Sequence, residues 1–343
     1  MSSIFLSAPI CKTGYGIASY NFAKTMIDMG QSVMLFPIGS VDPDMSYLTG
    51  NYVSKRANSL RIWHQNDVHP RIGTGKHFGF PIFELNKFTD IERRSMSLCD
   101  TILVCSEWAK RIVEEHVHID VQVVPLGVDT SLFRPVEEPT SPVTTFINVG
   151  KWEIRKGHDF LIHCFKKAFS SRDPVRLNLV PSNPFLTQQQ VDEWHRMATH
   201  EKIRIFPRIR HHERLMELMA EADVGVFPAR AEGWNLELLE MMALGKHVIA
   251  TDYSGHTEFA NSNNCRLINV PELETAVDDV WFHGQGQWAK LDTDAEEQMI
   301  FHMRECHQKK QSGSLGVNTS GIETANQFSW INSTKILLNR LNE

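Results

Sequence analysis

The sequence predicts an α/β fold with two domains. Its 343 residues exceed the length at which a single hydrophobic core usually stops growing. Apolar, β-prone runs alternate along the chain with amphipathic segments of helix length, which indicates parallel sheets with crossover helices. The alternation stops at the proline-rich segment 134–142 and then restarts. Two halves therefore repeat one architecture.

In the first half, the apolar runs predict strands separated by helices. Ser106 stands where a helix N-cap is expected, directly ahead of Glu107, so a helix is expected from there to about Glu115. A further helix is expected at 17–29, and the strands at 4–8, 32–37, 60–63, 78–83, 101–105 and 121–124.

The segment 134–142 is expected to separate the two domains. Three of its nine residues are prolines, which exclude both a helix interior and a central strand. The first domain is expected to span residues 1–138 and the second residues 143–325, with residues 326–343 forming a last helix.

The second half shows the same alternation. The strands are expected at 144–149, 175–180, 202–206, 223–227 and 247–251, and the helices at 158–169, 188–197, 213–220 and 236–244. Residues 278–311, rich in charged residues and histidine, are expected to pack helices on this domain.

Composition restricts the partners and the compartment. The net charge of −6 gives no general attraction for nucleic acid, which makes nucleic acid an unlikely partner. No run approaches the ~20 apolar residues that cross a bilayer, and the first residues lack the basic start and cleavage site of a signal peptide. We expect a cytoplasmic protein, with peripheral contact at the inner membrane face left open. The six cysteines show no CxxC pair or metal-ligand spacing.

The segment 228–240 is a candidate binding site. It lies between a strand and an apolar helix, at the carboxyl end of a parallel strand, where doubly wound folds bind ligands. Glu232 is placed to accept sugar hydroxyls. Glu240 lies about 7 Å along the helix from the cap residue Asn235, at ~1.5 Å per residue, and is placed to reach a ribose. Two solvated surface glutamates are the alternative.

A second candidate is the loop 150–157, which carries Lys151, Arg155 and Lys156 directly after a strand. Fixed positive charge beside helix-end amides is what a departing diphosphate requires. The alternative is a basic surface loop. Gly14 and Gly16 follow the first strand, where glycines let the backbone approach a ligand closely, although an ordinary tight turn has the same pattern.

The run 222–252 resembles the donor-site segment of the family 4 retaining glycosyltransferases, with the E-x7-E motif at Glu232 and Glu240. The resemblance extends to the first Gly-rich loop, to 124–135, to 150–157 and to 328–330, and so spans most of the chain. It implies the GT-B fold: two Rossmann-like domains with parallel sheets facing across a cleft, and a last helix that crosses back to the N-terminal domain.

The resemblance also implies roles for individual residues. Glu232 would bind the donor sugar and Glu240 the ribose, while Gly14 and Gly16 would line the cleft from the first domain. The remaining donor-binding residues would be Lys151, Arg155, Lys156, Gly233, Trp234, Asn235 and Leu236.

Enzymes of this kind usually need no metal, so no cofactor is expected and the nucleotide-sugar is a co-substrate. The acidic pairs Asp42/Asp44 and Asp292/Asp294 are accordingly interpreted as loop residues rather than metal ligands.

The sequence departs from the family pattern at three places. Lys151 stands where arginine is common, which replaces a bidentate fork by a point charge. Asn235 and Glu237 stand where many members have glycine and proline. Glu84 follows the strand after which many members place a histidine. We expect it near the reacting centre, orienting acceptor or donor hydroxyls, as a catalytic residue together with Glu232 and Lys156; a purely structural role is the alternative.

Tyr15, His64 and Glu84 are expected on the acceptor side. The predicted function is retaining transfer of a hexose-type sugar from a nucleotide-diphosphate-sugar to a hydroxyl of a glycan or a lipid-linked intermediate. The alternatives are an epimerase or hydrolase of the same fold, a binding module without turnover, and a transferase acting on a modified nucleic-acid base. The donor base and sugar are not fixed by the sequence.

Overall fold

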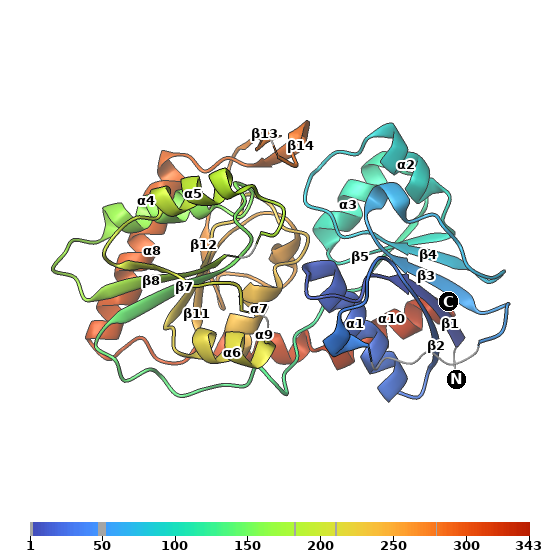
Figure 1. Ribbon diagram of the computed structural model, residues 1–343, viewed down its shortest axis with the longest axis horizontal. Helices are drawn as coiled ribbons and strands as arrows, with labels where there is room; N and C mark the ends of the chain where they lie inside the picture. Colours follow the sequence, from blue (N-terminus) through green and yellow to red (C-terminus); the bar gives the residue numbers. More distant parts are fainter. Residues whose placement is uncertain (1–2, 47–52, 182, 210, 279) are drawn as a thin grey trace. The chain divides into compact units, whose positions relative to one another are not determined.

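The computed structural model describes residues 3–46, 53–181, 183–209, 211–278 and 280–343. The chain forms two compact units, each built around its own sheet (Figure 1). The first unit comprises Met1–Gly127, Ser254–Glu258 and Phe328–Glu343, and the second comprises Val128–Tyr253 and Phe259–Gln327.

The first unit contains a six-stranded parallel sheet in the order β2-β1-β3-β4-β5-β6. Its strands are β1 (Ser3–Ala8), β2 (Ser32–Pro37), β3 (Asn58–Ile62), β4 (His77–Phe80), β5 (Thr101–Val104) and β6 (Asp120–Val123). Its helices are α1 (Gly14–Asp28), α2 (Asp90–Ser97), α3 (Glu107–His116) and α10 (Trp330–Asn342), with short 3-10 turns at Pro43–Met45, Gln65–Asp67 and Gly255–Glu258.

The second unit contains a six-stranded parallel sheet in the order β12-β11-β10-β7-β8-β9 and a separate antiparallel hairpin. The sheet strands are β7 (Thr144–Gly150), β8 (Val175–Pro181), β9 (Ile203–Ile205), β10 (Val224–Phe227), β11 (His247–Thr251) and β12 (Arg266–Ile268). The hairpin is β13 (Leu273–Val277) and β14 (His283–Ala289). The helices are α4 (His158–Ala168), α5 (Gln188–Met197), α6 (His212–Ala220), α7 (Leu236–Ala243), α8 (Thr293–Gln311) and α9 (Thr319–Gln327).

Four inner strands are buried along their whole length, which explains their largely apolar sequences. Every residue of β4, β5, β7 and β10 is buried. Parallel sheets covered on both faces need such runs instead of a polar–apolar alternation. The α/β class predicted from the sequence is therefore confirmed, with a parallel sheet in each unit.

Three element predictions are corrected. Helix α1 starts at Gly14 rather than residue 17, so the expected glycine loop is its first turn; a Cβ at Gly16 would lie 2.1 Å from the Cys11 carbonyl oxygen. Strand β4 stops at Phe80 because Pro81 cannot donate to a ladder. Residues 283–289, expected within helices, form β14, and α8 starts only at Thr293, where Asp292 caps it.

The division between the units lies before Val128, ahead of the proline-rich segment in which the sequence places it. The reason is that the chain already packs on the second unit at Phe133, before the first proline of this segment, and remains attached at Val136. Phe133 is buried and packs edge-on against His212, with ring centroids 6.0 Å apart. The Val136 amide donates to the Leu244 carbonyl at 3.3 Å.

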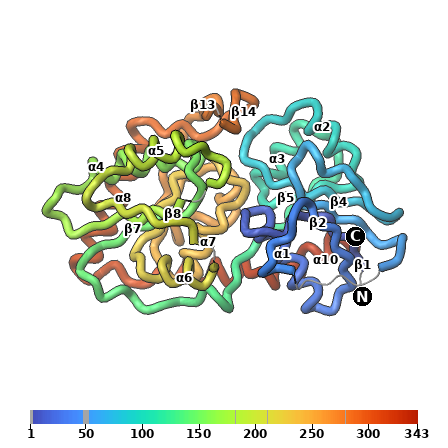
Figure 2. The backbone as a smooth tube through the Cα atoms, viewed as in Figure 1, coloured from blue at the N-terminus to red at the C-terminus, as the bar shows by residue number. Residues whose placement is uncertain are grey.

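The carboxyl-terminal helix α10 packs on α1 within the first unit, and Figure 2 shows the carboxyl terminus in this unit. The Trp330 ring meets Phe22 edge-on at 5.3 Å. Ser333 donates to the Leu126 carbonyl at 3.1 Å, and Asn58 donates to the Leu341 carbonyl at 2.7 Å. The end of the chain is therefore a structural part of the unit formed by its beginning. Among the described residues, no helix is long and apolar enough to cross a membrane.

Replacing Trp330 with alanine tests this packing. Trp330→Ala is expected to lower the free energy of unfolding by about 3–5 kcal/mol, because a large buried ring is lost. Ile331→Ala is the matched control, since Ile331 is 54% exposed, and it is expected to change stability by less than ~0.5 kcal/mol. Urea unfolding measures both variants, and hydrogen exchange in α1 localises the loss. Equal losses would contradict this role for α10.

Candidate functional site

Two loops meet at the carboxyl ends of the neighbouring strands β7 and β10. The Arg230 amide donates to the Arg155 carbonyl at 2.7 Å and joins the loop 151–157 to the loop 228–235. Gly157 has a φ of 72°, and a Cβ there would lie 2.0 Å from the Pro228 carbonyl oxygen. Glycine is therefore required at 157 for the loops to approach this closely.

A buried ion network links the same two loops. Arg155 lies 2.9 Å from Glu232 through Nη1 and 2.7 Å from Glu153 through Nη2. Lys156 Nζ lies 2.7 Å from Glu232 Oε1 and 3.9 Å from Glu237. The side chains of Arg155, Glu153 and Glu232 are at most 7% exposed. Removal of one partner would leave a buried charge without compensation, which makes the arrangement strongly constrained.

The charges around Lys156 keep its side chain protonated. Burial by itself lowers the pKa of Lys156, but the carboxylates of Glu232 and Glu237 outweigh burial and raise it. His158, the first residue of α4, responds in the opposite direction: burial is the main cause that lowers its pKa to about 4. The loop thus holds a fixed ammonium beside an uncharged imidazole at neutral pH.

The segment 232–236 leads into α7, whose first residue is Leu236. Asn235 adopts a left-handed conformation with a φ of 78°, and its side chain accepts the Leu238 amide at 3.3 Å. The amides of the two preceding helical residues have no intrahelical partner, as at any helix start. Trp234 is 2% exposed and packs on Phe259 at 4.9 Å, so its side chain belongs to the core and only its backbone remains for a ligand.

Glu240 is buried at the end of this segment, apart from the ion network. Burial raises its pKa well above the ordinary value, and the charges of Glu237 and Asp129 raise it further. His212 Nε2 lies 4.0 Å from Glu240 Oε1. The two predicted glutamates therefore lie in different environments: Glu232 is ion-paired, and Glu240 is desolvated.

The acceptor-side candidates gather in the first unit. The Tyr15 hydroxyl donates to the Ile82 carbonyl at 2.5 Å and accepts the Ile82 amide at 3.0 Å. The His64 ring lies 4.8 Å from the Tyr15 ring. Glu84 is half-buried, and its charge adds to the effect of burial in raising the pKa of Tyr15. Gly14 is exposed and Gly16 buried in the adjoining turn of α1.

The structure thus brings together Arg155, Lys156 and Glu232 in the second unit, and Tyr15, His64 and Glu84 in the first. Lys151 is 38% exposed and lies 3.8 Å from Glu153.

Glu153, Asp129 and His212 also lie at this site and were not predicted from the sequence. The position of Glu153 between Lys151 and Arg155 was an available signal for a compensating charge. No local pattern indicates that Asp129 and His212 approach Glu240.

The acidic pairs have structural roles. Asp42 accepts the Asp44 amide at 3.0 Å, and Asp44 pairs with Lys12. Asp292 caps α8 by accepting the Ala295 amide at 3.1 Å. Over the described part of the chain, no group of three or more histidine, cysteine, aspartate or glutamate side chains is arranged to hold a metal ion.

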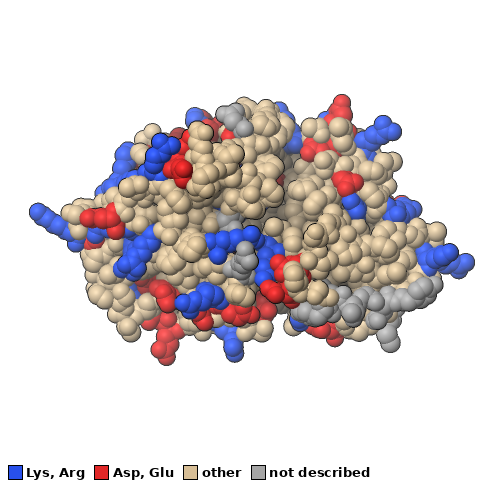
Figure 3. Space-filling model, viewed as in Figure 1, with Lys and Arg blue, Asp and Glu red and all other residues tan. Residues whose placement is uncertain are grey.

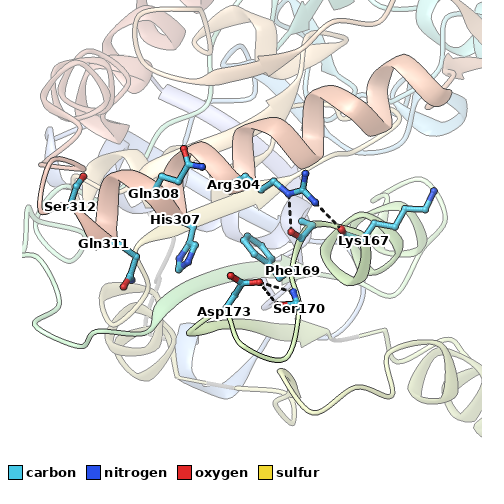
Figure 4. Close-up of a pocket in the computed structure, with 10 residues that line it drawn as sticks. Lys167, Phe169, Ser170, Asp173, Arg304, His307, Gln308, Gln311 and Ser312 are labelled. Carbon is cyan, nitrogen blue, oxygen red and sulfur yellow. Dashed lines mark hydrogen bonds between the residues drawn. The ribbon is translucent and has the colours of Figure 1, made fainter.

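A hollow of about 810 Å³ lies between the end of α4 and α8, and none of the predicted site residues lines it (Figure 4). Arg304 spans it and donates to the Ala168 and Lys167 carbonyls at 2.9 and 3.2 Å, which caps the end of α4. Asp173 accepts the Ser170 amide and hydroxyl. These polar side chains therefore hydrogen-bond to backbone groups at the end of α4 and in the turn that follows it.

On the face in Figure 3, basic side chains are interspersed with acidic ones.

Residues 143–281 match the family model for glycosyl transferases group 1, and this range contains both loops of the site in the second unit. Anabaena Alr3699/HepE in complex with UDP and glucose covers 100% of both chains with a TM-score of 0.73 at 13% identity. The fold is GT-B.

Two curated relatives align with part of the chain. "MMP alpha-(1->4)-mannosyltransferase" of Mycolicibacterium hassiacum is 28% identical over 202 residues, which are 55% of this chain and 47% of the relative. "D-inositol 3-phosphate glycosyltransferase" of Segniliparus rotundus is 26% identical over 152 residues, 39% of this chain and 32% of the relative. The chain thus spans about half of one relative and a third of the other. Both relatives are thus glycosyltransferases, as is the family that the matching model describes.

The environment of Glu240 predicts a pH dependence of stability. Because folding raises its pKa above the ordinary value of 4.5, its stabilising contribution is complete below that pH and is lost as the pH rises toward the folded value. Glu240→Gln removes this loss. Its advantage over the native protein in urea unfolding is expected to grow between about pH 5 and 8.

The matched control is Glu221→Gln, which changes an exposed glutamate at the end of α6. It is expected to show no such trend. A constant difference between Glu240→Gln and the native protein across this range would mean that Glu240 is ionised in the folded state without cost.

Proposed function

We propose that the protein is a retaining glycosyltransferase that moves a hexose-type sugar from a nucleotide-diphosphate-sugar to a hydroxyl of a glycan or lipid-linked acceptor. The observation that carries the proposal is the buried Arg155–Glu232–Lys156 cluster at the carboxyl ends of β7 and β10. The family match over this region and the GT-B neighbours solved with UDP and UDP-glucose support it.

Glu232 binds the donor sugar in this proposal. Its carboxylate is held from two sides, by Arg155 on one oxygen and by Lys156 on the other, so its position is fixed before any substrate arrives. Such preorganisation lowers the cost of orienting the sugar hydroxyls. Glu240 takes the ribose hydroxyls, for which a buried carboxyl beside a helix start is suited.

Lys151, Lys156 and the first amides of α7 stabilise the leaving diphosphate. The Lys156 ammonium has three donor hydrogens, so it keeps Glu232 while it contacts a phosphate oxygen. These fixed charges replace the Lewis acid that other transferases use, and the reaction is proposed to need neither a metal nor another cofactor.

Transfer occurs on one face of the sugar. The bond between the anomeric carbon and the phosphate oxygen breaks, the acceptor oxygen bonds to the same face, and the acceptor proton passes to the leaving diphosphate. A double displacement would need a free carboxylate nucleophile. Glu232 is unsuited because both of its oxygens are ion-paired. Glu84 is assigned to orient hydroxyls at the reacting centre, with Tyr15 and His64 on the acceptor side.

An epimerase or hydrolase of the same fold is the second candidate, since fold alone does not settle function. It would convert the nucleotide-sugar without an acceptor. A transferase for a modified nucleic-acid base is less favoured, because the net charge is −6.

Nucleotide-sugar binding and turnover test the proposal. A thermal-shift panel of UDP-, GDP-, ADP- and TDP-sugars is expected to give a shift with one base, because a ligand that binds only the folded state stabilises it. Glu240→Ala is expected to abolish the shift. Lys156→Met is expected to lower kcat/KM by about 10²–10³-fold, as for loss of one transition-state donor.

Lys167→Met is the matched control, since this lysine lies on α4 away from both loops and is 54% exposed. It is expected to leave the shift and the rate unchanged. Nucleotide release that depends on an acceptor identifies a transferase. Nucleotide release at the same rate without acceptor favours the hydrolase. Absence of a thermal shift with every nucleotide-sugar would contradict the proposed donor site.

A further inference from the structure

The second unit contains a pocket of about 210 Å³ directly beside the loop 151–157. Trp152 comes from that loop, Leu186 from the loop after β8, Trp194 from α5, and Trp281 from the turn between β13 and β14. Four segments that are far apart in the sequence therefore build one concave site. Its volume is below the roughly 300–1,000 Å³ of sites for drug-sized ligands, so it suits a single ring.

The pocket offers aromatic faces of two kinds. Trp152 and Trp194 stack on each other at 5.0 Å with an interplanar angle of 8°, and both are at least 90% buried, so they form a rigid base. Trp281 is 45% exposed and meets the exposed Phe185 edge-on at 5.4 Å. Lys151 Nζ lies 5.7 Å from the centroid of the Phe185 ring, and the adjoining exposed rings of Phe185 and Trp281 mark this place as a contact surface.

The polar groups of the pocket exclude an anionic ligand. Glu153, Glu193 and Asp278 line it, and no lysine or arginine is among its described lining residues. A phosphate or nucleotide would meet repulsion there. The carboxylate of Asp278 already accepts the amides of residues 280–282, and Glu153 is paired with Arg155. These two carboxylates are thus already engaged by amides and by a guanidinium, and a neutral ligand with many hydroxyls fits better than a cation.

We propose that this pocket binds a pyranose ring of the acceptor glycan. The flat C–H face of a pyranose packs on an indole, while carboxylate and amide groups at the rim accept and donate to its hydroxyls. The inference rests on the proposed function and deepens it. Of the two acceptor classes proposed, it favours a glycan over a lipid-linked acceptor that makes no contact through a saccharide. It adds a carbohydrate subsite on the unit that carries the donor loops.

The pocket is connected to the donor loops through Glu153. This carboxylate lines the pocket and pairs with Arg155, and Arg155 pairs with Glu232. A sugar that contacts Glu153 is therefore separated by the Arg155 guanidinium from Glu232, the carboxylate proposed to bind the donor sugar. The same buried network that positions the donor also positions one wall of the acceptor subsite.

Ligand-observed NMR without any nucleotide tests the subsite directly. Methyl α-D-glucopyranoside, methyl α-D-mannopyranoside and methyl β-D-galactopyranoside are the probes, with choline chloride and sodium phosphate as chemically different ones. Saturation transfer to at least one glycoside is expected. Trp281→Ala is expected to weaken it about fivefold or more, as for loss of an aromatic anchor, and Trp281→Phe to retain most of it.

Phe301→Ala is the matched control, because Phe301 is an exposed aromatic residue on α8, 62% exposed and outside this pocket. It is expected to leave the glycoside signal unchanged. Absence of transfer to all three glycosides, an equal signal in Trp281→Ala, or a stronger signal for choline or phosphate would overturn the subsite. Thermal shifts with nucleotide-sugars are recorded on the same variants, so a failed donor site is recognised separately from a failed subsite.

Discussion

The ion network around Arg155 is the constraint on which the site in the second unit depends. One guanidinium pairs with two buried carboxylates, Glu153 and Glu232, that belong to different loops. Gly157 allows these loops to touch, and the Arg230 amide joins their backbones. Such a cluster costs much to bury and is stable only when every partner is present. Its value is therefore in positioning Glu232 and Lys156 rather than in stability alone.

The proposed chemistry follows from the contrast between two buried glutamates. Glu232 is compensated by two cations, whereas Glu240 is desolvated and has a raised pKa. A carboxylate held by two cations suits oriented sugar hydroxyls near a charged leaving group. A carboxyl with little cationic support suits neutral ribose hydroxyls. The two residues of one motif thus serve different ends of a nucleotide-sugar because their surroundings differ.

Much of the fold could be predicted from the sequence because parallel strands buried on both faces have continuous apolar runs, as β7 and β10 do. The hairpin β13–β14 could not be predicted, since its exposed positions and Gly284 and Gly286 give no alternation. The candidate loops were found because they follow strands. The proximity of Asp129 and His212 to Glu240 depends on tertiary packing, for which no sequence spacing gives a signal.

A crystal structure with bound UDP-glucose, or with the nucleotide-sugar that gives the largest thermal shift, would show whether these loops bind the donor as proposed. We expect the diphosphate within hydrogen-bond reach of Lys156 and the first amides of α7, the sugar hydroxyls on Glu232, and an unbroken Arg155–Glu232 pair. A nucleotide-sugar bound away from these loops, or bound here with Glu232 turned away from the sugar, would contradict the proposed donor site.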